Sequence, residues 1–213
     1  MSRPAVFLDR DGVLVEEIFY PRTGEWEAPL GPEDVRLIPH AGAAARILAE
    51  AGYALVLVSN QAAFAKGKAS LRDLWLAHQR FVDLLAVECV QLVDAFYAYG
   101  HPNGTVPHFT GPSLDRKPGP YNLFIAAARH DLDLSRSWMV GDREADVICG
   151  TSAGVRAILV DNAHAVRDID YDGVRARDLQ DAARLILDAG SATDSRVEPG
   201  RPVPGPARGR AAS

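Results

Sequence analysis

The sequence predicts an α/β protein with a Rossmann-like arrangement of three layers (α/β/α), in which helices cover both faces of a parallel sheet. Short apolar runs alternate along the chain with longer segments that carry apolar residues at helical spacing. The runs are almost continuously apolar, which is typical of strands buried on both faces of a parallel sheet. Several of them end abruptly in polar side chains, at the edge where such sheets bind ligands. Sequential strand–helix units of this kind indicate a parallel sheet between two helical layers.

The first predicted strand is the apolar run Val6 to Leu8, which is followed at once by Asp9, Arg10 and Asp11. Because residues two apart on an extended backbone point the same way, we expect Asp9 and Asp11 to face one small volume while Arg10 turns elsewhere. Gly12 then allows the chain to turn sharply after the strand.

Residues 13–34 contain three prolines, two glycines and scattered aromatic side chains, a composition too broken for a long helix. We expect a loop or a small β-flap there, and no large cap domain. Because this segment directly follows the two carboxylates, it is either a lid over them or an ordinary surface excursion whose Tyr20 and Trp26 cover the sheet edge.

The remaining elements follow in alternation. The segment 40–51 is alanine-rich, is entered through Pro39 and stops before Gly52, and Pro120 suits the first turn of a later helix. The predicted helices cover residues 40–51, 71–92, 120–130, 143–153 and 178–189. The predicted strands after the first cover residues 53–58, 93–99, 137–140 and 155–160.

Residues 1–190 are predicted to form one domain, because a chain of 213 residues with 47% hydrophobic content can bury its own core. Residues 191–213 are rich in Pro, Gly and Arg with little to bury, and we expect this tail to be disordered. The tail holds four arginines against two carboxylates, so the net charge of −5 for the chain becomes −7 for residues 1–190. Such an acidic domain does not favour nucleic acid as a partner, and an anionic substrate would need locally placed basic groups.

The two cysteines, Cys89 and Cys149, lie in predicted helical stretches, and we expect them to be buried free thiols in a reducing cytoplasm. No apolar run approaches the roughly 18 residues of a membrane span, and the first strand begins almost at Met1, which leaves no room for a signal peptide. We therefore expect a cytoplasmic protein without a membrane partner. The sequence leaves the oligomeric state open, with a monomer as the simplest expectation.

Three predicted strands end in reactive side chains, and a loop brings a lysine toward them. The residues are Asp9 and Asp11, then Ser59, Asn60 and Gln61, then Asp142, with Lys117 from the loop. Their motifs, FLDRDG, LVSN, RKP and GDREAD, resemble the four motifs of the haloacid dehalogenase (HAD) superfamily of phosphatases over about residues 5–160. FLDRDG together with SNQ and RKPGP looks most like the branch that contains the heptose bisphosphate and histidinol-phosphate phosphatases.

This resemblance implies a phosphomonoesterase with an aspartyl-phosphate intermediate. Asp9 would be the nucleophile, and Asp11 would protonate the leaving alkoxide and then take a proton from water. Ser59 and Lys117 would bind the transferring phosphoryl oxygens, since a phosphate monoester is attacked only when its charge is neutralised. A lone DxD is more often a solvated turn or a helix cap, but here a buried strand precedes it and three further motifs accompany it.

The resemblance also implies Mg²⁺, held by side-chain oxygens of Asp9 and Asp142 and by the backbone carbonyl of Asp11. Asp142 has an alternative role as the N-cap of the helix that follows it. Asp146, one turn later, would orient Lys117 or a metal-bound water without binding the metal directly.

Asn60, Gln61 and Arg116 would contact the substrate beyond the scissile phosphate. Arg116 offers a planar fork for a second phosphate or a carboxylate, and its alternative is a salt bridge to Asp115. The chain leaves no room for a large cap, so we expect an open site that suits a small sugar or amino-alcohol phosphate, or the phosphorylated end of something larger. The resemblance implies a phosphorylated sugar as the substrate, most simply the 7-phosphate of a heptose bisphosphate.

One segment departs from the branch, whose members usually carry a structural zinc loop with three cysteines and a histidine before RKP. The corresponding residues 97–118 contain no cysteine. His101, His108 and Asp115 are conceivable ligands, but structural zinc sites normally show four N or S ligands, so we expect no zinc. The change leaves three alternatives to the heptose substrate: a histidinol-phosphate phosphatase, a polynucleotide 3′-phosphatase that the acidic domain disfavours, and a non-catalytic phospho-ligand binding protein.

Overall fold

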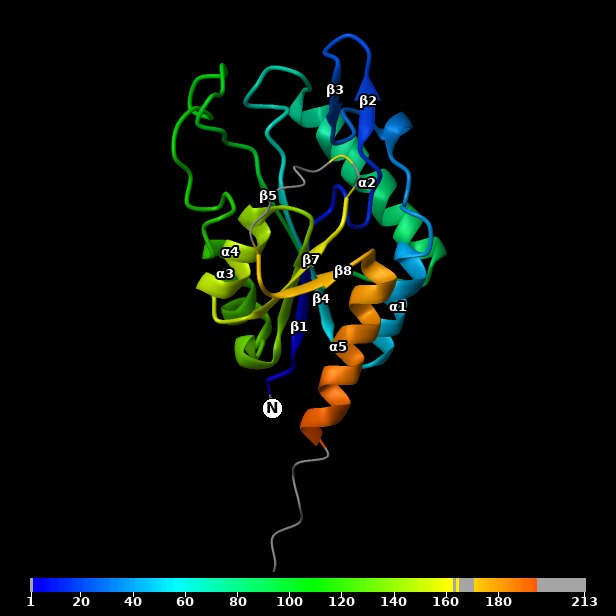
Figure 1. Cartoon of the computed structure of the whole chain (residues 1–213). Coiled ribbons are helices and arrows are strands. Elements are labelled where there is room, and N and C mark those ends of the chain that lie inside the picture. The colour runs from blue at the N-terminus through cyan, green and yellow to red at the C-terminus, as the bar shows by residue number, and fades with distance from the viewer. Residues whose placement is uncertain (1, 163, 165–170, 195–213) are drawn as a thin grey trace, which may run out of the picture.

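The computed structural model describes residues 2–162, 164 and 171–194, and it contains a six-stranded parallel sheet with helices on both faces (Figure 1). The spatial order of the strands is β5-β4-β1-β6-β7-β8, and each neighbouring pair is parallel. The strands of this sheet are β1 (Ala5–Leu8), β4 (Ala54–Asn60), β5 (Asp94–Ala98), β6 (Trp138–Gly141), β7 (Arg156–Val160) and β8 (Val174–Ala176). The predicted fold class is confirmed.

The helices divide between the two faces, as the alternation of side chains along β1 requires. Val6 and Leu8 pack in one core cluster with residues of α1 (Ala41–Glu50), α2 (Leu71–Val87) and α5 (Leu179–Asp194). Ala5 and Phe7 pack in a second cluster with residues of α3 (Tyr121–His130) and α4 (Glu144–Ser152). All four residues of β1 are fully buried, so the central strand is held rigidly between the layers.

The segment after β1 forms a small antiparallel hairpin, β2 (Ile18–Tyr20) and β3 (Glu25–Glu27), followed by the short helix η1 (Pro32–Asp34). The hairpin projects beyond the carboxyl edge of the sheet (Figure 1). Lys68 lies in the loop that precedes α2. Its Nζ forms ion pairs with Glu25 Oε2 at 2.8 Å and Glu27 Oε1 at 2.7 Å, which connect the hairpin to this loop. Of the two sequence-based alternatives, these contacts favour a flap over the strand ends. A second short helix, η2 (Leu134–Arg136), precedes β6.

Three elements differ from the prediction. Helix α2 ends at Val87 and not at residue 92, because the chain turns at Cys89, whose φ is +59°. Cys89 is consequently exposed, whereas Cys149 is buried as expected. The sixth strand, β8, was missed because its three residues carry no apolar run. Helix α5 continues through Gly190 to Asp194, four residues beyond the predicted domain end.

The predicted disorder of the tail concerns residues that, from 195 onward, lie outside those described. Within the described part of the chain, no helix combines the length and the apolar character that a membrane crossing needs.

Candidate active site

The ends of β1, β4 and β6 meet because β1 pairs with β4 on one side and with β6 on the other. Asp9, Ser59 and Asp142, each at or just beyond one of these ends, are thereby brought to one edge of the sheet. A cavity of about 610 Å³ opens there beneath the flap. Of the predicted site residues, those that line it are Asp9, Asp11, Asn60, Gln61, Arg116, Lys117 and Asp146. Ser59 and Asp142 are buried and do not line this cavity.

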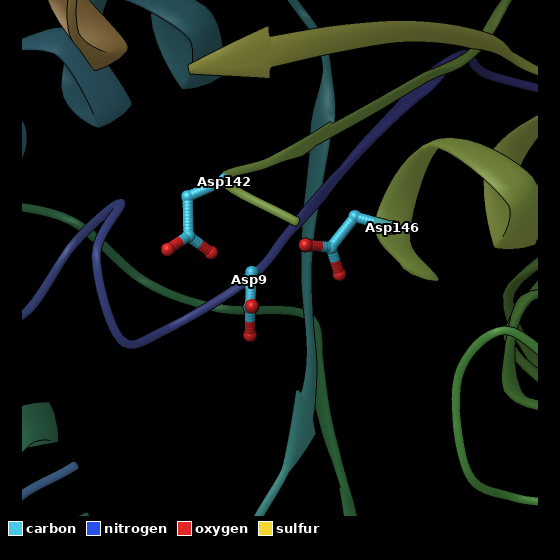
Figure 2. A group of neighbouring side chains, drawn as sticks. All are labelled: Asp9, Asp142 and Asp146. Carbon is cyan, nitrogen blue, oxygen red and sulfur yellow. The ribbon is translucent and has the colours of Figure 1, made fainter. Parts of the chain in front are cut away.

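Three buried carboxyl groups, those of Asp9, Asp142 and Asp146, face a common space (Figure 2). One oxygen from each lies within 4.8 Å of the other two. Burial, followed by the charges of Asp9 and Asp146, raises the pKa of Asp142 to about 8. Burial likewise raises the pKa of Asp146 to about 6, although the ammonium of Lys117 opposes the shift. The cluster therefore holds more negative charge than its own surroundings neutralise.

Lys117 is the cation of this cluster, and it is almost completely buried. Its Nζ lies 2.9 Å from Asp9 Oδ1 and 2.6 Å from Asp146 Oδ1, and it donates a hydrogen bond of 2.7 Å to the carbonyl oxygen of Val58. Burial alone would lower the pKa of Lys117, but Asp146 and Asp9 outweigh it and raise that pKa well above its usual range. Of the two partners expected for Asp146, Lys117 and a metal-bound water, the structure shows the contact with Lys117.

The start of α4 decides between the two roles considered for Asp142. Arg143 occupies the N-cap position, and the Asp146 carboxylate accepts a hydrogen bond of 3.0 Å from its backbone N–H. The N-cap interpretation of Asp142 is therefore wrong. Asp142 Oδ2 accepts a hydrogen bond of 2.8 Å from Asn162, while Asp142 Oδ1 is buried without a hydrogen-bond partner among the described residues.

Gly12 and Gly141 keep this arrangement open. A Cβ on Gly12, whose φ is +81°, would collide with the side chains of Asp142 and Asn162. A Cβ on Gly141 would collide with the side chain of Asp146. Two aspartates of the cluster can therefore reach their positions only because both neighbours lack a side chain.

Asn60 and Gln61 have structural partners that differ from the predicted substrate contacts. The Asn60 side chain forms two hydrogen bonds of 3.0 Å with the backbone of Lys117, one in each direction, and so fixes the loop that carries the lysine. Gln61 is buried, and its amide nitrogen donates to Asp11 Oδ2 at 2.6 Å and to Ser59 Oγ at 2.9 Å. The polar atoms of both side chains are already engaged by other residues of the site. Asn60 and Gln61 therefore position those residues.

Arg10 was predicted to point away from the site, and this prediction is wrong. Its side chain is fully buried, its Nε donates to Asp11 Oδ1 at 2.9 Å, and its Nη2 donates to Gln61 Oε1 at 3.0 Å. Regular strand geometry ends at Leu8, so the alternation of side chains that the prediction assumed does not extend to Arg10 and Asp11.

Arg116 and Arg143 lie on the wall of the cavity. Arg116 donates to the carbonyl oxygen of Gly100 at 3.2 Å, and burial together with the nearby Arg143 lowers its pKa. The alternative salt bridge to Asp115 does not occur among the ion pairs of the described residues. Arg116 has no carboxylate partner among the ion pairs of the described residues, and its charge favours an anionic ligand beyond the carboxylate cluster.

The sequence analysis missed Arg143, Glu17 and Asn162. Arg143 Nη2 lies 2.6 Å from Glu17 Oε1, and Asn162 bridges Glu17 Oε2 at 3.1 Å to Asp142. Arg143 could have been noticed from its place inside GDREAD, next to Asp142. Glu17 and Asn162 gave no signal, since each becomes relevant only through tertiary contacts.

The donor set fits a divalent cation. The charged side chains that meet at the site are Asp9, Asp11, Glu17, Asp142 and Asp146 against Arg10, Lys117 and Arg143. Arg10 pairs with Asp11 and Arg143 with Glu17. Lys117, which contacts Asp9 and Asp146, is therefore the cation left for these two carboxylates and Asp142. If all five carboxyl groups are ionised, an excess of two negative charges results, and a divalent cation would balance it. The unpartnered oxygen Asp142 Oδ1 is a hard ligand of the kind that Mg²⁺ prefers.

The three conceivable zinc ligands do not form a metal-binding group. In the described part of the chain, the group of histidine, cysteine or acidic side chains close enough to share a metal is Asp9, Asp142 and Asp146. His101 Nδ1 accepts a hydrogen bond of 3.0 Å from the backbone of Asn103, and Asp115 accepts one from the Ser113 hydroxyl.

Comparisons with known proteins agree with this geometry. The model of the HAD-hydrolase-like family matches residues 114–179. A D-glycero-D-manno-heptose-1,7-bisphosphate 7-phosphatase from Thermosynechococcus vestitus is 39% identical over 174 residues, which cover 80% of this chain and 85% of that protein. A D-glycero-beta-D-manno-heptose-1,7-bisphosphate 7-phosphatase from Rhodopseudomonas palustris is 33% identical over 72% of this chain and 81% of that protein.

Solved structures show the same fold. A crystal structure described as a HAD-like phosphatase from Mesorhizobium loti has a TM-score of 0.74 and 30% identity, and the match covers 89% of this chain and 87% of that one. The D,D-heptose 1,7-bisphosphate phosphatase of B. bronchiseptica, complexed with magnesium and phosphate, has a TM-score of 0.70 and 24% identity, covering 87% and 99%. The chain belongs to the HAD-type phosphatases, which are phosphoric monoester hydrolases, and within them to the family of these heptose bisphosphate 7-phosphatases.

Proposed function

We propose that the protein is a Mg²⁺-dependent phosphomonoesterase that removes the 7-phosphate of D-glycero-D-manno-heptose 1,7-bisphosphate. The observation that carries the proposal is the placement of Asp9 in the lining of the cavity, 2.9 Å from the buried ammonium of Lys117 and close to Asp142. A carboxylate held between a lysine and an uncompensated acidic cluster suits attack on a phosphoryl group.

In the proposed reaction, an oxygen of Asp9 forms a bond to phosphorus as the ester oxygen of the sugar leaves in line. Lys117 and the hydroxyl of Ser59 hold the phosphoryl oxygens. The lysine neutralises the negative charge of these oxygens, which a carboxylate cannot do. Asp11 gives its proton to the leaving alkoxide, and then accepts a proton from the water that hydrolyses the aspartyl phosphate. The products are the sugar hydroxyl and inorganic phosphate, and Asp9 is regenerated.

The residues that would hold the metal are Asp9 and Asp142 through their side chains and Asp11 through its backbone carbonyl. A bound Mg²⁺ would neutralise charge on the phosphoryl group and on the carboxylates around it. Asp146 remains a positioning residue, since its two oxygens are engaged by Lys117 and by the Arg143 backbone. The related phosphatase of B. bronchiseptica was crystallised with magnesium and phosphate, which supports this cofactor.

The substrate assignment is supported by the relatives and by the cavity wall. Curated relatives at 33–39% identity are named for the 7-phosphate of a heptose 1,7-bisphosphate, with both the alpha and the beta anomer among the names of the wider set. Arg116, which lines the cavity, offers positive charge to a phosphate that is retained when the first one is cleaved. Histidinol phosphate carries one phosphate and an amine, so it has no second phosphate that could bind to this positive charge.

Phosphate release from a small panel tests the substrate. With Mg²⁺ present, we expect kcat/KM to be highest for heptose 1,7-bisphosphate, presented as each anomer separately, ahead of histidinol phosphate, hexose phosphates and a 3′-phosphorylated oligonucleotide. The position of cleavage is read by phosphorus NMR of the product. A higher kcat/KM for histidinol phosphate or for the oligonucleotide would reject the heptose assignment while leaving the phosphatase chemistry in place.

Changing Asp142 to Asn tests the metal site without measuring turnover. In wild-type protein, Mg²⁺ at 100 times its Kd should raise the free energy of unfolding by about 2.7 kcal/mol. Asp142→Asn should abolish this stabilisation, because the unpartnered oxygen is lost. It should leave the metal-free protein at least as stable, because a neutral amide avoids the cost of ionising a buried carboxyl group beside Asp9 and Asp146. Thermal unfolding with and without Mg²⁺ measures both.

The matched control is Asp83→Asn, at an exposed position on α2. That variant should retain the full response to Mg²⁺. An equal Mg²⁺-induced shift in Asp142→Asn would show that Asp142 does not bind the metal.

A further inference from the structure

The buried guanidinium of Arg10 has no role in the reaction as described so far. We infer that Arg10 and Gln61 form a clamp that holds both oxygens of the Asp11 carboxyl group in the orientation needed for proton transfer. The inference rests on the proposed function, because it takes Asp11 as the general acid and base. It assigns Arg10 and Gln61 as positioning residues.

The clamp is a closed set of hydrogen bonds. Arg10 Nε donates to Asp11 Oδ1 at 2.9 Å, and Gln61 Nε2 donates to Asp11 Oδ2 at 2.6 Å. Arg10 Nη2 donates to Gln61 Oε1 at 3.0 Å, which joins the two donors to each other. Because each oxygen of Asp11 has its own donor, rotation of the carboxyl group about its Cβ–Cγ bond would break a buried contact.

The clamp also reaches the residue proposed to bind the phosphoryl group. The same Gln61 nitrogen that holds Asp11 donates to Ser59 Oγ at 2.9 Å. The Ser59 oxygen then accepts from Gln61, which leaves the hydroxyl proton free to be donated to a phosphoryl oxygen. Gln61 thus fixes the distance between the general acid and one phosphoryl-binding group.

A second layer holds Arg10 itself. Its guanidinium lies 5.6 Å from the ring centre of Tyr97 on β5, and the Tyr97 hydroxyl is 2.8 Å from Nδ1 of His78 on α2. Arg10 is therefore packed from three directions, by Asp11, Gln61 and Tyr97. These partners hold the guanidinium in a single orientation, so that its N–H groups stay directed at Asp11 and Gln61.

Stability alone gives a poor account of this buried ion pair. Replacing a buried pair by apolar residues of similar volume is often neutral or stabilising, since the desolvation of both charges opposes their attraction. General acid catalysis, in contrast, requires the acid within hydrogen-bond reach of the leaving oxygen and rewards a fixed orientation. The placement of the pair beside Asp9 favours the second explanation.

The leaving group of the substrate distinguishes positioning of the acid from a general structural role. An alkoxide needs a proton in order to leave, whereas p-nitrophenolate is weakly basic and leaves without one. Gln61→Met should therefore slow formation of the aspartyl phosphate from an alkyl or sugar phosphate by about 10- to 100-fold. The pre-steady-state burst of p-nitrophenolate from p-nitrophenyl phosphate should fall by a clearly smaller factor, which reports only the lost contact between Gln61 and Ser59.

Arg10→Lys supplies an independent variant, since it keeps the positive charge and removes the planar guanidinium that donates to both Asp11 and Gln61. It should show the same selective loss with alkyl substrates. Gln79→Met, on the exposed face of α2, is the matched control and should behave as wild type with both substrates. Thermal unfolding of each variant confirms that it is folded before its rates are compared.

An equal loss with both leaving groups, or no loss with either, would overturn the clamp. The proposed function fails by a different result, namely unchanged turnover in Asp9→Asn. The two failures are therefore distinguishable in one set of measurements.

Discussion

Replacing Asp9 by Asn is expected to abolish turnover, with kcat falling by about 10⁴-fold or more. The amide nitrogen and oxygen of Asn are poor nucleophiles toward phosphorus, so no covalent intermediate forms. The side-chain carbonyl can still accept the hydrogen bond from Lys117, whose Nζ lies 2.9 Å from Asp9 Oδ1 in the wild type. The loss should therefore reflect chemistry and not a collapse of the site.

Two measurements separate these explanations. Rapid acid quench of wild-type protein with substrate, followed by mass spectrometry of the peptide that contains Asp9, should detect a phosphorylated aspartate that Asp9→Asn lacks. Thermal unfolding of metal-free Asp9→Asn should give a midpoint equal to or above that of the wild type, because one charge of the carboxylate cluster is gone.

Asp83→Asn serves as the control for the substitution itself and should keep full activity. Retention of more than about a tenth of wild-type kcat in Asp9→Asn would contradict a nucleophilic role for Asp9.

The convergence of the site was predictable because it follows from topology. A buried run that ends in two aspartates, a second run that ends in Ser59, and a third that ends beside Asp142 must meet if the strands are parallel and adjacent. The pairing of β1 with both β4 and β6 is what makes this true here. The contact between Asp146 and Lys117 was one of two alternatives that the same motifs allowed, and it is the one that the structure shows.

The positions of Arg10, Asn60 and Gln61 could not be predicted, for a common physical reason. Each side chain lies at or beyond the end of a strand, where regular alternation no longer fixes its direction. There the direction depends on hydrogen-bond partners that are distant in the sequence, such as the backbone of Lys117 for Asn60. Hydrogen bonds of this kind are set by the fold and leave no periodic pattern in the sequence.

Two errors in the elements have local causes. The exposure of Cys89 follows from one residue with positive φ just after α2, which the apolar pattern of residues 71–92 does not reveal. Strand β8 forms because β7 offers it an edge, while its own three residues contain an exposed valine and an exposed arginine. In both places tertiary structure overrides a weak local signal.

Lys117→Met is expected to be the most destabilising change at the site, because Lys117 is the cation that faces Asp9 and Asp146 in a buried cluster. Removing one partner of a buried ion pair costs about 3–5 kcal/mol, since the remaining charge stays desolvated. Urea unfolding of the metal-free protein measures this loss. Turnover should fall by at least about 10³-fold, because the phosphoryl oxygens lose their cation.

Lys68→Met provides the comparison for stability. Lys68 also faces two carboxylates, those of Glu25 and Glu27, but this cluster is partly exposed to solvent. Its loss should cost no more than about 1 kcal/mol, because water screens the charges that remain. Equal losses from Lys117→Met and Lys68→Met would show that burial does not govern the energy of the Lys117 contacts.

A double variant separates the two roles of Lys117. Adding Asp146→Asn to Lys117→Met removes a carboxylate that the lysine had neutralised, so a substantial part of the lost stability should return. Turnover should not return, because the amide brings no positive charge to the phosphoryl group. If activity recovered together with stability, the function of Lys117 would be to hold the fold of the site. If stability alone recovered, the lysine would act on the substrate, as the proposed mechanism requires.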